Sequence, residues 1–286
     1  MINRLAVIGV GLIGGSTALA LRAAGAVTEV VGAGRSRVNM ERAKALGIVD
    51  RIADSAADAV AGADAVLVAV PVGAMRAVFA EIAPWLAPDA VVTDAGSTKA
   101  SVLVDARVAL GAAFPRFVAA HPIAGTEHSG ADAAFATLLR GRRVILSPTP
   151  ETDPAANARV RALWQATGAQ VSAMDGARHD QLLAATSHLP HVLAYVLVDS
   201  LTRMPDSEDL LAVAAGGFTD FTRVASSNPE MWTDIVAANS EALLALIDRY
   251  QNDLSALRDA IAQGEQETIR DCFQRAKMAR DRFVAP

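Results

Sequence analysis

The stretch Leu5-Ala6-Val7-Ile8-Gly9-Val10-Gly11-Leu12-Ile13-Gly14 decides the fold of this chain. Its first four residues are apolar, as in a buried parallel strand, and a helical pattern follows at 17–24. The Gly-x-Gly-x-x-Gly spacing permits a tight turn and lets backbone N–H groups approach a pyrophosphate closely. The N-terminus of the helix adds unpaired N–H groups and a partial positive charge. We therefore predict a dinucleotide-binding loop that includes Gly9, Gly11, Leu12, Ile13 and Gly14.

Apolar runs continue to alternate with helical patterns as far as residue 174. We expect further strands at 29–32, 65–70, 90–94, 117–120, 144–146 and 170–172. Val70 and Pro71 stand at the carboxyl end of one strand, the edge where open α/β sheets bind ligands, so both are assigned to the cofactor site. The predicted fold class is α/β. A Rossmann-type dinucleotide-binding domain spans 1–174, and an all-helical domain for substrate binding and dimerisation spans 175–286.

The residues after the second predicted strand bear on which cofactor binds. A site that prefers NAD usually has an acid about 20 residues beyond the glycine motif, where it holds the ribose 2′-hydroxyl. Here the sequence Gly34-Arg35-Ser36-Arg37 stands in that place. Because arginine forms charge-assisted hydrogen bonds with phosphate, these four residues favour the 2′-phosphate of NADP. The alternative is a solvated basic turn that accepts NAD as well.

A polar stretch begins at His121, directly after a predicted strand. That strand delivers His121 to the ligand-binding edge of the sheet, where a histidine can act as an acid or a base near neutral pH. Ser97 reaches the same edge after the preceding strand. Either Ser97 or Thr98 could instead cap the next helix, which is predicted over 99–110.

No strand pattern follows residue 174, and the second half is predicted to be helical. Its first helix, at 179–201, contains Pro190, which removes a hydrogen bond and bends a helix. His188 and His191 are three residues apart and would lie on one face. They could be metal ligands, core residues or polar groups of a cleft. Because no third ligand stands at a suitable spacing, we prefer a cleft to a metal site.

Three further features follow along the helical half. The stretch Ala214-Ala215-Gly216-Gly217-Phe218 interrupts the helical pattern and permits a close approach of backbones. Arg223 stands among apolar neighbours and is expected to reach into a pocket or an interface. Apolar residues then recur at spacings of four and three, which predicts one long helix with a stripe for the core or a dimer interface. The stripe comprises Leu243, Ile247, Tyr250, Leu254, Leu257 and Ile261. A last amphipathic helix is expected at 265–283.

Composition limits the class of protein. The 286-residue chain has a formal net charge of −5, so we do not expect non-specific binding to nucleic acid. Its one cysteine, Cys272, excludes an intramolecular disulfide and a cysteine-rich metal cluster. We expect no signal peptide, and no membrane span because no uncharged apolar run approaches the necessary length. These observations predict a soluble cytoplasmic protein.

Five segments, taken in order, resemble the prephenate/arogenate (cyclohexadienyl) dehydrogenase family of tyrosine biosynthesis. They are Gly9–Gly14, Asp94–Lys99, His121–Gly125, Ser187–His191 and Gly216–Arg223. The resemblance covers almost the whole chain. It implies the oxidative decarboxylation of L-arogenate, prephenate or both with NAD(P)+, and a homodimer formed through C-terminal helices. In that reaction a hydride leaves the ring carbon that bears the 4-hydroxyl, carbon dioxide leaves the opposite carbon, and the ring becomes aromatic.

The resemblance also implies roles for single residues. His121 accepts a hydrogen bond and then the proton from the 4-hydroxyl of the substrate, and Ser97 hydrogen-bonds both that hydroxyl and His121. Arg223 binds a substrate carboxylate. The other positions assigned to the substrate site are His188, His191, Thr126, Glu127, Gly216, Asp220 and Trp232. Among them Glu127 guards the entrance, and Glu127 or Asp220 could pair with the ammonium group of arogenate.

Two departures and two alternatives remain at this point. The basic turn at 34–37 differs from the acid-bearing members of the family. No chorismate mutase segment precedes Met1 and no regulatory domain follows Phe283, so we expect any feedback to act at the active site. A reductase like the β-hydroxyacid dehydrogenases should carry a catalytic lysine on the first long helix after the sheet, and 179–201 has none. A non-catalytic NADP(H) sensor needs the glycine motif but not the polar residues of the other four segments.

Overall fold

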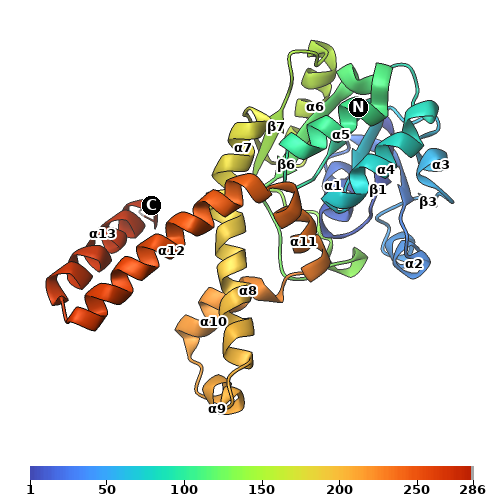
Figure 1. Ribbon diagram of the computed structural model, residues 1–286. Helices are drawn as coiled ribbons and strands as arrows, with labels where there is room; N and C mark the ends of the chain where they lie inside the picture. The colour runs from blue at the N-terminus through green and yellow to red at the C-terminus, as the bar shows by residue number, and fades with distance from the viewer. Residues whose placement is uncertain (285–286) are drawn as a thin grey trace. The chain divides into compact units, whose positions relative to one another are not determined.

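The computed structural model describes residues 1–284, and its N-terminal part is built on one eight-stranded sheet (Figure 1). The strands lie in the order β3-β2-β1-β4-β5-β6-β7-β8, and neighbours are parallel except for the antiparallel pair β6 and β7. They are β1 (Ile2–Ile8), β2 (Val27–Ala33), β3 (Arg51–Ile52), β4 (Ala65–Val68), β5 (Val91–Asp94), β6 (Phe117–Pro122), β7 (Arg143–Ser147) and β8 (Gln170–Ala173). The predicted α/β fold is confirmed, and only the two-residue β3 had no predicted counterpart.

Helices cover both faces of this sheet because its strands are buried on both sides. In β1, Leu5 and Val7 belong to one apolar core, whereas Ala6 and Ile8 belong to the other. The first core includes residues of α1 (Leu12–Ala23), α2 (Arg37–Ala45) and α6 (Pro154–Ala166). The second includes residues of α3 (Ala56–Val60), α4 (Val72–Ile82) and α5 (Ala100–Leu110). Short 3₁₀ turns lie at Ala83–Trp85, Gly111–Arg116, Ala131–Ala133 and Arg223–Ser226.

The glycine loop joins β1 to α1, beside the point where the sheet changes direction from β1 to β4. Gly9 has a φ of +94°, and a Cβ on it would stand 2.5 Å from the carbonyl oxygen of Ala69. A Cβ on Gly14 would stand 2.3 Å from the carbonyl oxygen of Gly9. A Cβ on Gly11 would meet nothing within 4 Å. The fold therefore requires Gly9 and Gly14, whereas Gly11 borders open space.

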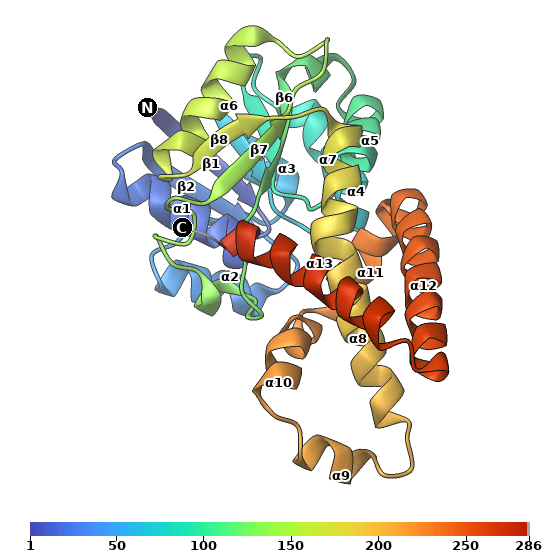
Figure 2. The same cartoon turned by 90° about the vertical axis from the view of Figure 1, so that its left-hand side faces the viewer.

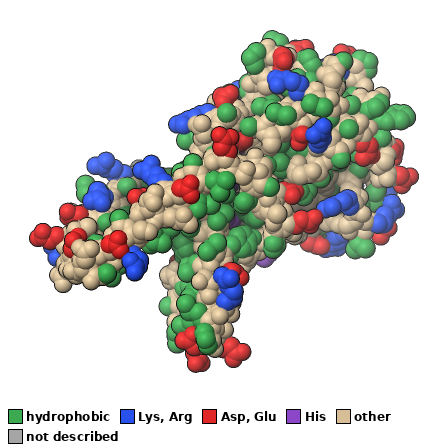
Figure 3. Space-filling view, viewed as in Figure 1, with side chains coloured by type: hydrophobic (Ala, Val, Ile, Leu, Met, Phe, Trp, Pro, Cys, Tyr) green, Lys and Arg blue, Asp and Glu red, His purple; other side chains and the backbone are tan. Residues whose placement is uncertain are grey.

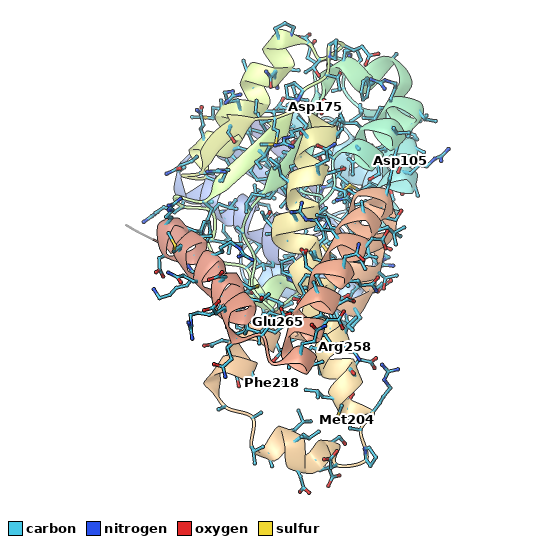
Figure 4. The ribbon with its side chains drawn as sticks, turned by 60° about the vertical axis from the view of Figure 1, so that its left-hand side comes forward. Asp105, Asp175, Met204, Phe218, Arg258 and Glu265 are labelled. Carbon is cyan, nitrogen blue, oxygen red and sulfur yellow. The ribbon has the colours of Figure 1, made fainter. Side chains whose placement is uncertain are left out.

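The second half begins with a rod of three helical segments in line (Figure 2). They are α7 (Gly176–Leu183), a π-helical turn at Ala184–His188 and α8 (Leu189–Thr202). Pro190 lies in the first turn of α8, where the wide π turn accommodates its missing N–H group. The helix predicted at 179–201 thus has a π turn where a bend was expected. Figure 4 labels Asp175 just before this rod and Met204 just beyond it.

Three short helices follow the rod: α9 (Ser207–Ala212), α10 (Gly216–Thr222) and α11 (Pro229–Ala238). The predicted interruption at 214–218 is present in part, because helix stops between Ala212 and Gly216, and Gly216 then begins α10. A Cβ on Gly216 would meet nothing within 4 Å, so no close backbone approach requires this glycine. Asp234 of α11 accepts a hydrogen bond of 3.1 Å from the backbone N–H of Gly73, which fixes α11 to the start of α4.

The rod also overturns the reason given against a membrane span. Gly176–Thr202 forms 27 residues of continuous helix, and an 18-residue window of it has a mean hydropathy of 1.3, which is enough to cross a membrane by length and composition. One such helix is a weak indication, because helices of soluble proteins pass the same test. Two polar residues of this rod, His179 and Asp180, are buried and hydrogen-bond to the sheet part. Figure 3 shows hydrophobic side chains gathered along its outer surface.

The chain divides into two compact units, Met1–Ser240 and the residues from Glu241 onward. The second unit holds α12 (Ser240–Gln263) and α13 (Gln266–Val284), so both predicted C-terminal helices are confirmed. Gly264 takes a φ of +69° in the turn between them. Of the predicted stripe on α12, Leu243 is buried within this chain, whereas Tyr250, Leu254 and Ile261 are exposed. The domain boundary predicted after residue 174 is a different division and stays a prediction.

The two crowded glycines yield a stability prediction. Gly9→Ala and Gly14→Ala force a methyl group against a carbonyl oxygen, so each should lower the free energy of unfolding by about 1–3 kcal/mol or more. Gly11→Ala is the matched control and should leave the free energy of unfolding almost unchanged. Urea denaturation of the three variants measures these effects. Equal losses in all three would contradict the steric argument.

Candidate active site

Four of the five histidines form one connected group at the carboxyl ends of β5 and β6. They are His121, His179, His188 and His191, all within the first compact unit. His121 is the fifth residue of β6 and is half-buried. Within residues 1–284, no group of three or more His, Cys, Asp or Glu side chains is placed to hold a metal ion.

A buried ion pair fixes the backbone that carries His121. Asp94, the last residue of β5, binds Lys99 Nζ through Oδ2, and neither side chain is exposed. Asp94 Oδ1 accepts a 2.9 Å hydrogen bond from the backbone N–H of Ala120, and Lys99 Nζ donates one of 2.7 Å to the carbonyl oxygen of Ala120. Side chains therefore hold β6 just before His121. Both residues belong to the segment Asp94–Lys99 of the family resemblance, but no role was predicted for either of them.

His121 lies in a chain of hydrogen bonds that the sequence analysis missed. Its Nδ1 is 2.8 Å from Nε2 of His179, and Nδ1 of His179 is 2.7 Å from Oδ1 of Asp180. His179 and Asp180 are buried in α7. In the sequence-based prediction His179 was only the first residue of the helix at 179–201. The adjacent histidine and acid were the one visible signal, and their contact with His121 depends on chain folding over long range.

The same aspartate caps helix α5 from a distant part of the chain. Asp180 Oδ1 accepts a 2.7 Å hydrogen bond from the backbone N–H of Lys99, and Oδ2 accepts one of 2.8 Å from that of Ala100. An anion is favourable here because the N-terminus of a helix presents free N–H groups and partial positive charge. The proposed capping by Ser97 or Thr98 was wrong, since Lys99 is the N-cap residue and no side chain within the turn caps it.

Asn239 connects this aspartate to a third histidine. Its Nδ2 donates to the carbonyl oxygen of Asp180 at 2.8 Å and also lies 3.1 Å from Nδ1 of His188. Because the carbonyl group can only accept, Nδ2 is the donor to both, and the proton of neutral His188 resides on Nε2. This Nε2 is buried and has no hydrogen-bond partner among the described residues. His188 thus presents an unused donor.

Trp232 of α11 brings the two predicted pocket histidines together. Its ring stacks on that of His191 with centroids 3.7 Å apart, and it meets the ring of His188 edge-on at 6.0 Å. His191 Nδ1 donates to the carbonyl oxygen of Ser187 at 2.8 Å. Trp232 is buried, and its Nε1 has no partner among residues 1–284. The predicted proximity of His188 and His191 is present, with an aromatic ring between them.

Burial keeps His121, His188 and His191 neutral near pH 7. Desolvation lowers the pKa of His121 well below its usual 6.5, and the nearby Lys99, His179 and His188 lower it further. Desolvation also lowers the pKa of His188 to about 4. The pKa of His191 falls through burial as well. Neutral imidazoles can accept or donate single hydrogen bonds, so the group suits proton transfer better than anion binding.

The remaining predicted substrate residues are exposed, and two of them, Arg223 and Glu127, approach each other. Nη1 of Arg223 is 3.6 Å from Oε2 of Glu127, and 61% of the Arg223 side chain is exposed. Thr126 accepts a 3.2 Å hydrogen bond at Oγ1 from the backbone N–H of His128. Gly216 and Asp220 are exposed on α10, and Asp220 forms no side-chain hydrogen bond or ion pair within residues 1–284. The predicted clamp and entrance acid thus contact each other.

Ser97 lies in the loop between β5 and α5 and is half-buried. Its hydroxyl makes no hydrogen bond with the described part of the protein. The structure brings Ser97 to the same sheet edge as His121, because β5 and β6 are parallel neighbours. The hydroxyl is therefore free for a ligand.

The glycine loop fits a dinucleotide. Helix α1 begins at Leu12 with Gly11 as its N-cap, and no side chain caps it. The N–H groups of Leu12, Ile13 and Gly14 can therefore bind pyrophosphate oxygens. Val70 borders the loop, because its Cγ1 would lie 3.1 Å from a Cβ on Gly9, and Pro71 follows at the start of α4.

The turn at Gly34–Arg37 is exposed at the end of β2, as predicted. Ser36 caps α2, since its Oγ accepts a 3.2 Å hydrogen bond from the N–H of Asn39. Arg37 pairs with Glu41 at 2.9 Å. Arg35 forms no ion pair or side-chain hydrogen bond with the described residues. Of the two arginines, Arg35 is thus the one whose charge is free.

The low pKa of His188 predicts a loss of stability in acid. In the unfolded chain this imidazole takes up a proton near pH 6.5, whereas in the folded protein it stays neutral down to about 4. Between these two pH values the unfolded state binds more protons than the folded state. The free energy of unfolding therefore decreases as the pH is lowered from 6.5 to 4, and this group accounts for about 3 kcal/mol of the decrease. Urea denaturation at pH 7, 5.5 and 4 should show a shallower decline for His188→Asn. His128→Asn, changed on an exposed loop, should decline like the wild type. An equally steep decline in His188→Asn would assign the effect to other groups.

Family models match almost the whole chain. Residues 17–173 match the prephenate dehydrogenase nucleotide-binding domain, and residues 175–275 match the prephenate dehydrogenase dimerization domain. The chain is 39% identical to a cyclohexadienyl dehydrogenase of Zymomonas mobilis over 97% of this chain and 95% of that protein. It is 34% identical to a prephenate dehydrogenase of Bacillus subtilis over 96% of this chain and 74% of that protein.

Solved structures agree with these matches. The fold superposes on Aquifex aeolicus prephenate dehydrogenase, solved with hydroxyphenyl propionate and NAD+, with a TM-score of 0.91, 35% identity and 99% coverage of both chains. For a Synechocystis arogenate dehydrogenase the TM-score is 0.79 at 29% identity, with 98% of this chain and 100% of that chain covered. The protein is an NAD(P)-dependent dehydrogenase with a nucleotide-binding sheet domain and a dimerization domain. The chain belongs to the prephenate dehydrogenase family.

Proposed function

We propose that this protein converts L-arogenate, prephenate or both to L-tyrosine or 4-hydroxyphenylpyruvate by oxidative decarboxylation with NAD(P)+. The observation that carries the proposal is the neutral His121 at the carboxyl end of β6, on the sheet edge that also bears the glycine loop. A base at this position can remove the proton of a substrate hydroxyl. A nicotinamide cofactor held by the glycine loop would take up the hydride from the ring carbon that bears this hydroxyl.

The other site residues support a substrate that is aromatic-sized and carries carboxylates. His188 and Trp232 each present a buried N–H group without a protein partner, which suits acceptor oxygens of a ligand. Arg223 supplies a positive charge at the exposed side, where it can bind a carboxylate in two-point fashion. Ser97 offers a free hydroxyl for the 4-hydroxyl group of the substrate.

Prephenate and arogenate differ in a keto or an ammonium group on the side chain. Glu127 and Asp220 are the acids assigned to that end of the site. Glu127 already lies near Arg223, whereas Asp220 has no charged partner among the described residues. The proposal therefore includes both substrates. One relative is named a cyclohexadienyl dehydrogenase, and this name covers prephenate and arogenate alike.

Neither alternative function is favoured. The rod Gly176–Thr202 contains no lysine, which counts against a β-hydroxyacid-dehydrogenase type of site. Solved reductases of that general kind share the fold at 18% identity or less, for example a ketopantoate reductase with a TM-score of 0.57, and so bear on the fold alone. A sensor without catalysis is disfavoured because relatives with high coverage are named dehydrogenases.

We also propose that NADP is the preferred cofactor and that NAD is accepted. Arg35 is exposed, has no partner in the described part of the chain and stands where an acid would select NAD. Ser36 uses its oxygen as an acceptor from Asn39, so its O–H group is free to donate to a phosphate. Arg37 is held by Glu41 and contributes less.

The dimer proposed here is formed by C-terminal helices. The family model over 175–275 is a dimerization domain, and a stripe of α12 that includes Leu254 and Ile261 is exposed in the single chain. Apolar side chains of the rod, such as Val196, are exposed as well. A partner subunit would bury such side chains. The absence of nucleic-acid and membrane partners and a cytoplasmic location stay predictions of the sequence.

Initial rates with prephenate and with L-arogenate, each with NAD+ and NADP+, test the proposed reaction. At least one combination should reduce the cofactor. His121→Asn should lower kcat by about 10²–10⁴-fold, with little change in cofactor binding, because it removes the base. His128→Asn is the control and should retain wild-type rates. If none of the four combinations shows hydride transfer, the proposed reaction is contradicted. If His121→Asn keeps full turnover, His121 is not the base.

Arg35→Ala tests the cofactor choice. Removing this guanidinium should raise KM for NADP+ by about 10-fold or more and leave KM for NAD+ nearly constant, since only the 2′-phosphate is affected. Arg76→Ala, an exposed arginine on α4, is the matched control. Equal losses for both cofactors would refute the role given to residues 34–37.

A further inference from the structure

Asp180, His179 and His121 form a chain of hydrogen bonds, and the proton positions in it can be worked out from the Asp180 end. Asp180 already accepts from the backbone N–H groups of Lys99 and Ala100, as a carboxylate does. Nδ1 of His179, 2.7 Å away, must then donate to it. When His179 is neutral its Nε2 has no proton and accepts the hydrogen bond from Nδ1 of His121. His121 is thereby left with a bare Nε2, the atom that can accept a proton from a substrate.

Building on the proposed function, we infer that His179 and Asp180 are positioning residues that hold His121 in its Nε2-accepting tautomer and share the proton that it takes up. The pair acts only through His121, since His179 is fully buried and Asp180 nearly so. This arrangement fixes the imidazole ring as well, because the His121 and His179 rings meet at 63° with centroids 5.0 Å apart.

Proton sharing can be written with each bond accounted for. The O–H bond of the substrate breaks as an N–H bond forms at Nε2 of His121. The Nδ1–H bond of His121 then lengthens or breaks as an N–H bond forms at Nε2 of His179, which places positive charge next to the Asp180 carboxylate. When carbon dioxide leaves and the ring becomes aromatic, the same proton returns to the phenolic oxygen. Neither a proton nor an electron is left over on the protein.

Burial explains why it is useful for His121 and His179 to share the proton. The overall reaction neither releases nor consumes a proton, so the proton must be held and then returned. An imidazolium on His121 alone is disfavoured by desolvation and by the nearby Lys99, itself paired with Asp94. His188 is the other titratable group near the base, and it is neutral at pH 7. Sharing with His179 moves the charge away from Lys99 and toward an anion.

Two substitutions at His179 separate this role from simple packing. His179→Phe keeps a planar ring but removes the acceptor, and should lower kcat by about 10²-fold or more with little change in KM. The acid limb of its kcat/KM profile should move to lower pH, because the protonated base loses the neutral imidazole that accepts from its Nδ1, whereas only a charged His179 lowers the pKa of His121. His179→Gln can still accept from Nδ1 of His121 through its amide oxygen, so it should recover part of the lost kcat. Its acid limb should stay below that of the wild type, since an amide cannot take the proton.

The control is His128→Gln, which should match the wild type in rate and pH profile. Unchanged kcat in His179→Phe would overturn the inference. So would a loss of kcat that leaves the acid limb in place and that His179→Gln does not repair, since that pattern is what lost packing produces.

A second readout needs no turnover. With five histidines in the chain, ¹⁵N NMR of the histidine-labelled, substrate-free protein at pH 7 can assign each ring. His121 should be protonated at Nδ1 and bare at Nε2, and His179 protonated at Nδ1. In His179→Phe this bias at His121 should be lost. A proton on Nε2 of His121 in the wild type would overturn the inference even if the enzyme is active. Failure of all substrate and cofactor combinations would instead reject the proposed function and leave the tautomer result standing.

Discussion

The Asp180 carboxylate is the contact on which the arrangement of the site depends. It is buried, and an ionised acid is stable in such a place only if hydrogen bonds replace its water. Three donors do so: the N–H groups of Lys99 and Ala100, and Nδ1 of His179. One group therefore fixes the start of α5, the position of α7 and the orientation of a histidine. Without it, two N–H groups at a helix terminus would be buried and unpaired.

The buried part of the site around Asp180 consists almost entirely of paired or neutral groups. The Asp94–Lys99 pair holds the end of β6, and burial keeps the imidazole of His121 neutral. His188 ends the π turn after α7 and is buried, and Asn239 sets its proton on Nε2. An acceptor at His121 and a donor at His188 are thus available to a ligand. Low dielectric strengthens each of these hydrogen bonds.

The outer part of the site follows a different principle. Arg223 and Glu127 are exposed and separated by 3.6 Å, and such pairs contribute little to stability. Their side chains can therefore exchange partners when a carboxylate or an ammonium group arrives. The inner groups are held by buried hydrogen bonds, which suits the fixed geometry that a proton transfer needs, whereas the exposed outer groups can adapt to related substrates. This contrast agrees with a family that contains prephenate, arogenate and cyclohexadienyl dehydrogenases.

The sequence by itself determined the glycine loop, the α/β order and the delivery of His121 to the sheet edge, because each depends on residues close together in the chain. It also identified the family through short motifs. Only the tertiary structure decided the partners of those residues. The cap of α5 comes from Asp180 instead of Ser97 or Thr98, and His121 is oriented by His179. Hydrogen bonds between residues 58 or more positions apart, which set the tautomers, leave no local pattern. Burial, which lowers the pKa of His121, His188 and His191, exists only once the chain has folded.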